Sequence, residues 1–210
     1  MRIVLVIFSV VLSTLASANY PDHWWNKVDD LASWEISPDS AIKGLEVVLS
    51  KRNELGILSN FAHTPFVLDG KKFESIEGLW QSMKYPDPFL KDDIRQNEAW
   101  EYSRKQVELM IGFEAKKAGD IGTKIMRKYD LNWVSYLGEK MVYRTDKKLR
   151  HYDIILAAMK AKLDQNLSVK KVLIQTCGLK LLADHHVKLT DPPAWRYYQI
   201  WQELRASLCR

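Results

Sequence analysis

Residues 66–85 decide the fold, and they read FVLDGKKFESIEGLWQSMKY. The dipeptide Asp69-Gly70 separates two short apolar runs and is typical of a tight β-hairpin turn, which needs positive φ angles. After the hairpin, Ile76, Leu79 and Met83 recur at helical spacing, so a helix is predicted to follow directly. A hairpin joined to an amphipathic helix is typical of an α+β protein.

The rest of the chain is predicted to be mostly helical, because apolar residues recur at helical spacing in most of its segments. The predicted helices cover residues 39–56, 107–113, 121–129, 133–143, 154–163, 169–174 and 192–204. Residues 179–182 are predicted to form a short strand. The expected fold class is therefore α+β: a helix-dominated single domain with a small antiparallel sheet.

The composition is that of an ordinary globular protein, with 210 residues, 47% of them hydrophobic and 27% charged. It excludes a collagen, a disordered tail and a disulfide scaffold, and the length suits one domain without repeats or long linkers. The net charge of +5 mildly favours phosphate-bearing partners. Eight Trp and nine Tyr residues offer faces for stacking on bases, although most are expected in the core.

The first 18 residues are predicted to be a secretory signal peptide. Met1-Arg2 provides a positive start, residues 3–12 are almost wholly apolar, and Ala16-Ser17-Ala18 is a small-x-small cleavage site. The alternative, an uncleaved anchor, is disfavoured because the apolar run is too short to cross about 30 Å of hydrocarbon. We expect a mature chain that starts at Asn19, is periplasmic or secreted, and has no stable membrane insertion.

The mature chain is expected to have two parts, a Trp-rich N-terminal extension over residues 19–38 and a main domain over residues 39–210. The extension contains Trp24, Trp25 and Trp34 and is expected to pack on the core. The two cysteines, Cys177 and Cys209, could pair in an exported protein. Their separation in sequence does not determine their distance in space, so the pairing stays open.

The densest chemical pattern follows the hairpin. On a helix at about 100° per residue, Glu77, Trp80, Gln81 and Lys84 project from one face, and the apolar stripe occupies another. From the spacing alone, a solvated face is the plainer interpretation. The preceding loop Ser59-Asn60-Phe61 favours a binding site, because a polar and aromatic loop beside a helix N-terminus suits ribose hydroxyls or a phosphate.

These residues resemble the NADAR family, also called YbiA-like. The resemblance runs through Leu58-Ser59-Asn60-Phe61, Pro65-Phe66, Leu68-Asp69-Gly70-Lys71, Phe73, Ser75, Glu77, Gln81 and Lys84. It continues through Glu114-Ala115-Lys116-Lys117-Ala118-Gly119, Trp133, Ala161-Lys162-Leu163-Asp164-Gln165-Asn166 and the segment from Leu173 to Thr176. The pieces occur in order over about residues 50–205, and their joint occurrence is more specific than any single piece.

The resemblance implies a YbiA-like fold and N-glycosidase activity. Known members cleave an amino-pyrimidine from ribose phosphate among riboflavin-pathway intermediates, or remove ADP-ribose from guanine. Both substrates contain a bond between ribose C1 and an exocyclic amine of a base. The expected partner is a nucleotide or ADP-ribosyl substrate, with ADP-ribosylated nucleic acid as one form of it; no cofactor and no metal are expected, and the oligomeric state stays open.

Breaking a ribosyl C–N bond builds positive charge on the sugar, so a carboxylate is needed near C1 and the departing nitrogen must be neutralised. The predicted catalytic residues are Glu77, Lys84 and Asp191. Lys84 has three open roles: to bind phosphate, to protonate the base, or to attack C1 of the opened sugar as an amine. The predicted substrate-binding residues are Ser59, Asn60, Phe61, Trp80, Gln81, Trp133, Asp184 and Trp195.

Two departures from the family pattern bear on turnover. Asp120 stands where the family usually has Arg, and residues 191–196 are one residue longer, with Arg196 in place of a Gly. These departures support a second hypothesis, a non-catalytic module of the same fold that binds ADP-ribose or a nucleotide. A third hypothesis, a non-enzymatic protein that binds nucleic acid or the cell envelope, predicts strongly salt-dependent binding.

Overall fold

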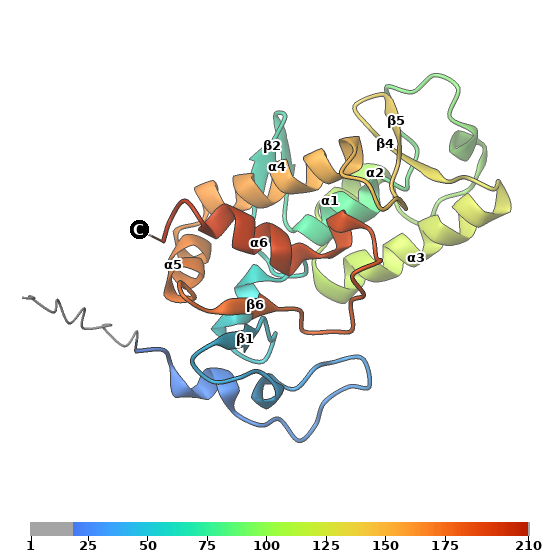
Figure 1. Ribbon diagram of the computed structural model, residues 1–210. Helices are drawn as coiled ribbons and strands as arrows, with labels where there is room; N and C mark the ends of the chain where they lie inside the picture. Colours follow the sequence, from blue (N-terminus) through green and yellow to red (C-terminus); the bar gives the residue numbers. More distant parts are fainter. Residues whose placement is uncertain (1–18, 210) are drawn as a thin grey trace, which may run out of the picture.

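The computed structural model describes residues 19–209, in which six α-helices combine with three two-stranded sheets (Figure 1). The predicted signal peptide, residues 1–18, lies outside the described residues. The fold is α+β and helix-dominated, as predicted, and one main hydrophobic cluster joins its elements. In the described part of the chain, no helix combines the length and the apolar character needed to cross a membrane.

Two of the sheets are antiparallel hairpins. β2 (Phe66–Leu68) and β3 (Lys71–Phe73) form the predicted hairpin, with Phe66 opposite Phe73 in the register. Its turn is Asp69-Gly70, with φ angles of 49° and 75°. The turn chemistry therefore identified this element correctly.

The second hairpin corrects the helix predicted over residues 133–143. β4 (Trp133–Tyr136) and β5 (Glu139–Val142) pair through a turn in which Leu137 and Gly138 have φ angles of 49° and 82°. Ser135, buried on β4, donates its backbone N–H to the carbonyl of Met83 at 3.0 Å. The helical spacing of a short apolar run is ambiguous, and here the turn and this tertiary contact select the strand form.

The helix predicted over residues 39–56 is also wrong. β1 (Glu46–Val48) lies in this segment and pairs in parallel with β6 (Lys180–Leu182), which the sequence predicted as a strand. Val47 and Val48 are fully buried, and β-branched side chains suit a buried strand. The partner strand comes from the far end of the chain, so no local pattern signals the pairing.

The α-helices are α1 (Ile76–Ser82), α2 (Arg104–Glu108), α3 (Gly112–Lys128), α4 (Arg150–Gln165), α5 (Leu167–Gln175) and α6 (Tyr197–Arg205). They overlap the segments that the apolar periodicity predicts, except that residues 107–113 are not one helix: they contain the end of α2, a break at residues 109–111 and the start of α3. α1 is central and packs against α2, α3 and α4 (Figure 1). Short 3-10 helices complete the fold: Asp22–Trp25, Pro38–Ser40, Glu54–Leu58, Ile94–Asn97 and Pro193–Trp195.

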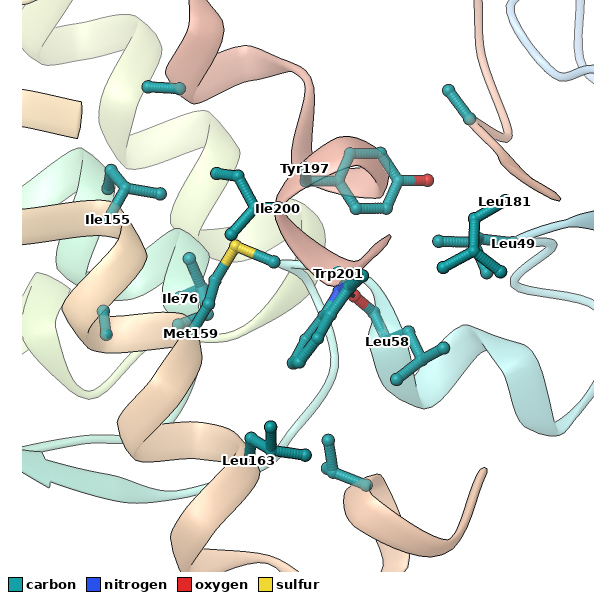
Figure 2. Close-up of a cluster of buried hydrophobic side chains, with 14 of the residues drawn as sticks. Leu49, Leu58, Ile76, Ile155, Met159, Leu163, Leu181, Tyr197, Ile200 and Trp201 are labelled. Atoms are coloured by element: carbon teal, nitrogen blue, oxygen red, sulfur yellow. Dashed lines mark hydrogen bonds between the residues drawn. The ribbon is translucent and has the colours of Figure 1, made fainter. Parts of the chain in front are cut away.

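The main core surrounds Trp201 of α6, which is fully buried. Its indole Nε1 donates to the carbonyl of Leu58 at 2.7 Å, and Ile155 and Met159 of α4 belong to the same cluster (Figure 2). Leu58 immediately precedes the polar loop that begins at Ser59. The core therefore fixes the position of a loop that the sequence predicts to bind substrate.

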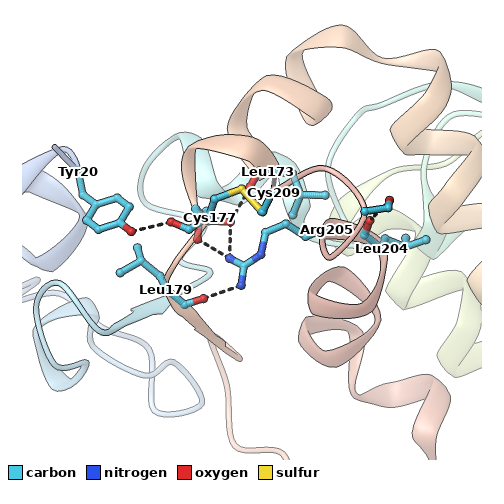
Figure 3. The surroundings of a disulfide bond; sticks show 9 residues. Tyr20, Leu173, Cys177, Leu179, Leu204, Arg205 and Cys209 are labelled. Carbon is cyan, nitrogen blue, oxygen red and sulfur yellow. Dashed lines mark hydrogen bonds between the residues drawn. A yellow bond between two sulfur atoms is a disulfide. The ribbon is translucent and has the colours of Figure 1, made fainter. Parts of the chain in front are cut away.

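The N-terminal extension packs on the core, and the two cysteines form a disulfide with a Cα–Cα distance of 5.6 Å. The hydroxyl of Tyr20 donates to the carbonyl of Cys177 at 2.6 Å (Figure 3). Arg205 adds hydrogen bonds to the carbonyls of Thr176 and Leu179. The bond between Cys177 and Cys209 thus joins the end of α5 to the segment after α6, and the extension is attached at the same place.

Candidate functional site

A cleft of about 700 Å³ opens along α1 and α3. All but two of the predicted site residues line it: Ser59, Asn60, Phe61, Glu77, Trp80, Gln81, Lys84, Asp184 and Trp195. The solvated-face interpretation of the helix is wrong, because Glu77, Gln81 and Lys84 are each at most 7% exposed. The polar face of α1, with Lys84 in the turn directly after the helix, is instead a buried wall of the cleft.

Trp133 and Asp191 do not line this cleft, which corrects their assignment to the site. The indole of Trp133, on β4, lies 4.5 Å from the guanidinium of Arg95 and 4.6 Å from the ammonium of Lys140. The carboxylate of Asp191 accepts the backbone N–H of Lys188 at 2.7 Å and closes a local turn. Each side chain has a structural partner outside the cleft.

Local sequence explains how α1 is positioned. Ser75 is its N-cap: its hydroxyl accepts the backbone N–H of Gly78 at 2.9 Å and donates to the carbonyl of Met110 at 2.8 Å. Gly78 permits close packing, because a Cβ atom there would lie 2.6 Å from the carbonyl oxygen of Met110 and 2.9 Å from that of Val107. With this side of α1 held against α2, Glu77 faces the cleft.

Glu77 is a buried carboxyl group with one direct side-chain partner among the described residues. Its Oε1 accepts a hydrogen bond from Nε2 of Gln81 at 2.6 Å. Burial raises the pKa of Glu77, opposed by the hydrogen bond from Gln81 and by the charges of Lys84, Lys116 and Lys51. A carboxyl group whose pKa is raised by burial inside a cleft is suited to acid–base chemistry.

Lys84 is a buried amine that, among residues 19–209, forms no ion pair with a carboxylate. Its Nζ donates to the hydroxyl of Thr123 at 3.0 Å and to the carbonyl of Gly119 at 3.3 Å. Burial lowers the pKa of Lys84 to about 8, although the nearby charge of Glu77 acts in the opposite direction. At mildly alkaline pH a large fraction of the amine is therefore neutral.

Asp184 lines the cleft, but its carboxylate already accepts hydrogen bonds from neighbouring side chains. It accepts hydrogen bonds from Lys51, from Nδ1 of His185 at 2.8 Å and from the hydroxyl of Tyr197 at 2.8 Å. Burial alone would raise its pKa, but the hydrogen bonds and the charge of Lys51 outweigh burial and lower the pKa to about 2. Asp184 therefore fixes Lys51 and Tyr197 in place.

One face of α3 lines the cleft along most of the helix, and the sequence analysis named only Lys116 and Asp120 of it, through the family pattern. The residues on this face are Phe113, Lys116, Asp120, Thr123 and Arg127. They recur every three or four residues, so the signal was a polar helical stripe. The pattern of the stripe does not predict which part of the protein it faces.

The cations of the cleft fall into two groups. Lys51 pairs with Asp184, and Lys116 pairs with Asp120 at 2.5 Å, so a carboxylate neutralises each. Lys84, Arg127 and Arg144 have no carboxylate within ion-pair distance in the described chain. Arg127 lies at the end of the lining face of α3 away from Phe113, and the charge of Arg144 acts on Lys84; we call Arg127 and Arg144 the arginine end of the cleft. Unpaired guanidinium groups are suited to bind phosphate.

Three aromatic rings, from Trp34, Phe61 and Phe113, form what we call the aromatic mouth of the cleft. The ring of Phe113 lies 5.2 Å from that of Phe61 and 6.1 Å from that of Trp34, with edge-to-face geometry in both pairs. Trp34 and Phe113 are 39% and 64% exposed, so their faces are accessible. The sequence analysis placed Trp34 only in the extension, because no motif linked it to the other two rings.

The comparisons with known proteins found one similarity of structure. No family model and no curated protein matches this chain. The solution NMR structure of the Escherichia coli protein YbiA is similar to it, with a TM-score of 0.48 and 18% sequence identity over 80% of this chain and 87% of that chain. A likeness at this level assigns no activity.

Proposed function

We propose that this protein is an N-glycosidase of the NADAR type, which hydrolyses the bond between ribose C1 and an exocyclic amine of a base. The observation that carries the proposal is that a buried carboxyl group, Glu77, and a buried amine, Lys84, line the same cleft. Burial raises the pKa of Glu77 and lowers the pKa of Lys84. An acid and a base whose pKa values approach each other are suited to work together near neutral pH.

The proposed reaction breaks the C1–N bond and forms a bond between C1 and a water oxygen. Glu77, as a carboxylate, stabilises the positive charge of the sugar and accepts a proton from the attacking water. Lys84, as an ammonium, donates a proton to the departing nitrogen. Transfer of the proton from Glu77 back to Lys84 restores both groups, so the net reaction is hydrolysis.

Lys84 also supports a covalent route, in which its neutral amine attacks C1 of the ring-opened substrate, where C1 is doubly bonded to the nitrogen of the base. The bond from C1 to that nitrogen breaks and the base leaves as the free amine. C1 stays bound to Lys84 as an imine, which water then hydrolyses. Borohydride reduces an imine to a stable amine, so a trapped adduct at Lys84 identifies this route. Mass spectrometry of the trapped peptide separates the two roles. Absence of the adduct during active turnover would exclude the covalent route and leave proton transfer and phosphate binding as the roles of Lys84.

Other residues of the cleft are suited to hold the substrate. The side-chain oxygen Oδ1 of Asn60 is buried without a hydrogen-bond partner in the described chain, so it can accept a bond from a sugar hydroxyl. Trp80 and Trp195 provide walls, and the rings of Trp80 and the buried His151 meet edge to face at a centroid distance of 4.8 Å. The arginine end supplies charge for phosphate.

The decisive test is the variant Glu77→Gln. We expect turnover to fall about 100-fold or more, because the amide cannot accept a proton from water. Release of free base is measured by chromatography from ADP-ribosylated guanine and from phosphoribosylamino-pyrimidines. Glu74→Gln is the matched control, since Glu74 pairs with His63 and Lys72 outside the cleft. Unchanged turnover in a folded Glu77→Gln protein would exclude Glu77 from the reaction.

A non-catalytic nucleotide-binding module is the second candidate. Asp120 favours it, because this residue lies in the cleft and neutralises Lys116 where the family resemblance implies an arginine. Under this alternative the wild-type protein binds ADP-ribose but releases base from no member of the substrate panel. The same chromatographic experiment therefore distinguishes the two candidates.

We further propose that the mature protein works outside the cytoplasm. The predicted signal peptide and the disulfide between Cys177 and Cys209 support this proposal, because disulfides persist in oxidising compartments. N-terminal sequencing of the exported protein tests it. The expected first residue is Asn19, and a retained Met1 would contradict cleavage.

A further inference from the structure

We infer that the cleft binds its substrate in one direction, with the leaving base on the aromatic mouth and the phosphate at the arginine end. This inference rests on the proposed function and deepens it by assigning a base subsite and a phosphate subsite. It also gives the N-terminal extension a role in substrate recognition, because Trp34 comes from that segment.

The order of the groups along the cleft follows from α3. Phe113 and Arg127 lie at opposite ends of its lining face, about 21 Å apart along the axis at about 1.5 Å per residue. Lys84 contacts Thr123, between these ends, and Glu77 lies nearer the mouth, because its backbone N–H donates to the carbonyl of Asn60, the residue before Phe61. The catalytic pair therefore lies between the mouth and the arginine end.

This order matches the order of groups in the substrate. In a phosphoribosyl or ADP-ribosyl amine, the scissile bond separates the base on one side from the ribose and its phosphate on the other. A base that leaves toward the mouth finds exposed aromatic faces, which stack on any base. A phosphate at the other end meets the guanidinium group of Arg127, whose charge no carboxylate of the described chain neutralises.

Binding of the substrate in the reverse direction is electrostatically unfavourable. Lys51 is a cation at the mouth, 5.1 Å from the ring centroid of Trp34 and 5.3 Å from that of Phe61. Its charge is already neutralised by Asp184. A phosphate at the mouth would therefore meet a paired cation beside a carboxylate, and the base would meet unpaired arginines.

Trp34 is held at the cleft by its neighbours in the extension. Glu35 accepts hydrogen bonds from Arg52, at 2.5 Å from Nη2 and 3.1 Å from Nε, and forms a β-bridge with His185. The backbone N–H of Ile36 donates to the carbonyl of Asp184 at 2.9 Å. Because the ring of Trp34 is already fixed, little conformational entropy is lost when it binds a base.

The test is an NMR titration of the purified protein with two probes, guanosine for the base and ribose 5-phosphate for the phosphate. We expect Trp34→Ala to weaken guanosine binding about fivefold or more, with ribose 5-phosphate binding unchanged. We expect Arg127→Gln to weaken ribose 5-phosphate binding about tenfold, with guanosine binding unchanged. The indole N–H signal of Trp34 should shift with guanosine alone.

Phe89→Ala and Lys105→Gln are the controls, because both residues are exposed and lie outside the cleft. Each should leave both affinities unchanged. If Trp34→Ala weakened ribose 5-phosphate binding and Arg127→Gln weakened guanosine binding, the substrate would lie in the reverse direction. If both variants had equal effects or none, or if neither probe bound, the two ends would not be separate subsites. Each of these results overturns the inference, whereas base release by the wild-type protein decides the proposed function independently.

Discussion

Two lysines of this protein are buried without a carboxylate partner in the described chain, and their surroundings give them different roles. Lys84 lies in the wall of the cleft, where a substrate can exchange protons with it. Lys162 of α4 is fully buried and donates to the carbonyl of Ser59 at 2.8 Å, beneath the polar loop. Burial lowers the pKa of Lys162 to about 7. One lysine affects the pH dependence of activity, and the other that of stability.

Lys84 predicts the alkaline limb of the activity profile. If the ammonium of Lys84 protonates the leaving base, kcat/KM falls above about pH 8, because the pKa of Lys84 is lowered to about 8. The raised pKa of Glu77 places the acid limb above the ordinary carboxyl range. Base release measured across pH gives the profile. Residual activity of Lys84→Arg should lack the alkaline limb, and a wild-type rate that stays flat through pH 8 would contradict this role.

Lys162 predicts how stability depends on pH. Its pKa is about 7 in the folded state and 10.5 ordinarily, so the unfolded chain binds more protons between these values. The free energy of unfolding therefore gains up to about 1.4 kcal/mol per pH unit from this group as pH rises through that window. Below pH 7 the lysine is protonated in both states, and its destabilising effect is constant.

Lys162→Met should remove this contribution. Urea unfolding at several pH values between 7 and 10 measures the slope. Lys160→Met is the control, because Lys160 is exposed on the same helix and pairs with Asp164 at 2.5 Å. Equal slopes in the wild-type protein and Lys162→Met would contradict the prediction.

At the scale of elements, the position of α1 depends on its contact with the segment that joins α2 to α3. Gly78→Ala tests this contact. Alanine is ordinarily favoured over glycine in a helix by about 0.5–1 kcal/mol. Here its Cβ would lie 2.6 Å and 2.9 Å from backbone carbonyl oxygens, which cannot rotate away, so overpacking should prevail.

We expect Gly78→Ala to lower the free energy of unfolding by about 1–3 kcal/mol. Chemical denaturation measures the change, and Lys117→Ala on the exposed side of α3 is a control that should have little effect. A more stable Gly78→Ala protein would show that α1 and α2 can separate without cost. The position of Glu77 would then not depend on this contact.

At the scale of the whole molecule, the disulfide joins the end of α5 to the segment after α6 across 32 residues of sequence. The double variant Cys177→Ser, Cys209→Ser should lower the free energy of unfolding by about 2–4 kcal/mol, because the unfolded chain is no longer constrained. Neither cysteine lines the cleft, so activity below the unfolding temperature should be unchanged. Reduced wild-type protein should unfold like the variant, and equal stability with and without reductant would contradict the prediction.

The cleft itself is a property of the whole molecule, because its walls come from segments far apart in sequence. Trp34 comes from the extension, Phe61 from the loop before the first hairpin, and Phe113 from the start of α3. Arg144 follows β5, and Asp184 follows β6. No element alone presents a binding surface of this kind.

The sequence by itself determined the features that depend on neighbours along the chain. The Asp69-Gly70 turn specified the first hairpin, and the apolar spacing in α4 and α5 specified those helices, because turn chemistry and side-chain periodicity act within a few residues. The same local reasoning brought Glu77 and Lys84 to one side of the chain, although α1 ends at Ser82 and Lys84 lies in the turn that follows it. The family resemblance supplied the chemistry expected of these two residues.

Only the tertiary structure decided which residues meet. It brought Trp34 and the arginine end into the cleft, left Asp191 and Trp133 outside it, and paired the cysteines. It also converted two predicted helices into strands, β1 through pairing with β6 and β4 through pairing with β5. These outcomes depend on contacts between residues distant in sequence, or on competition between two locally acceptable forms. A local window contains neither the partner nor its free energy of packing.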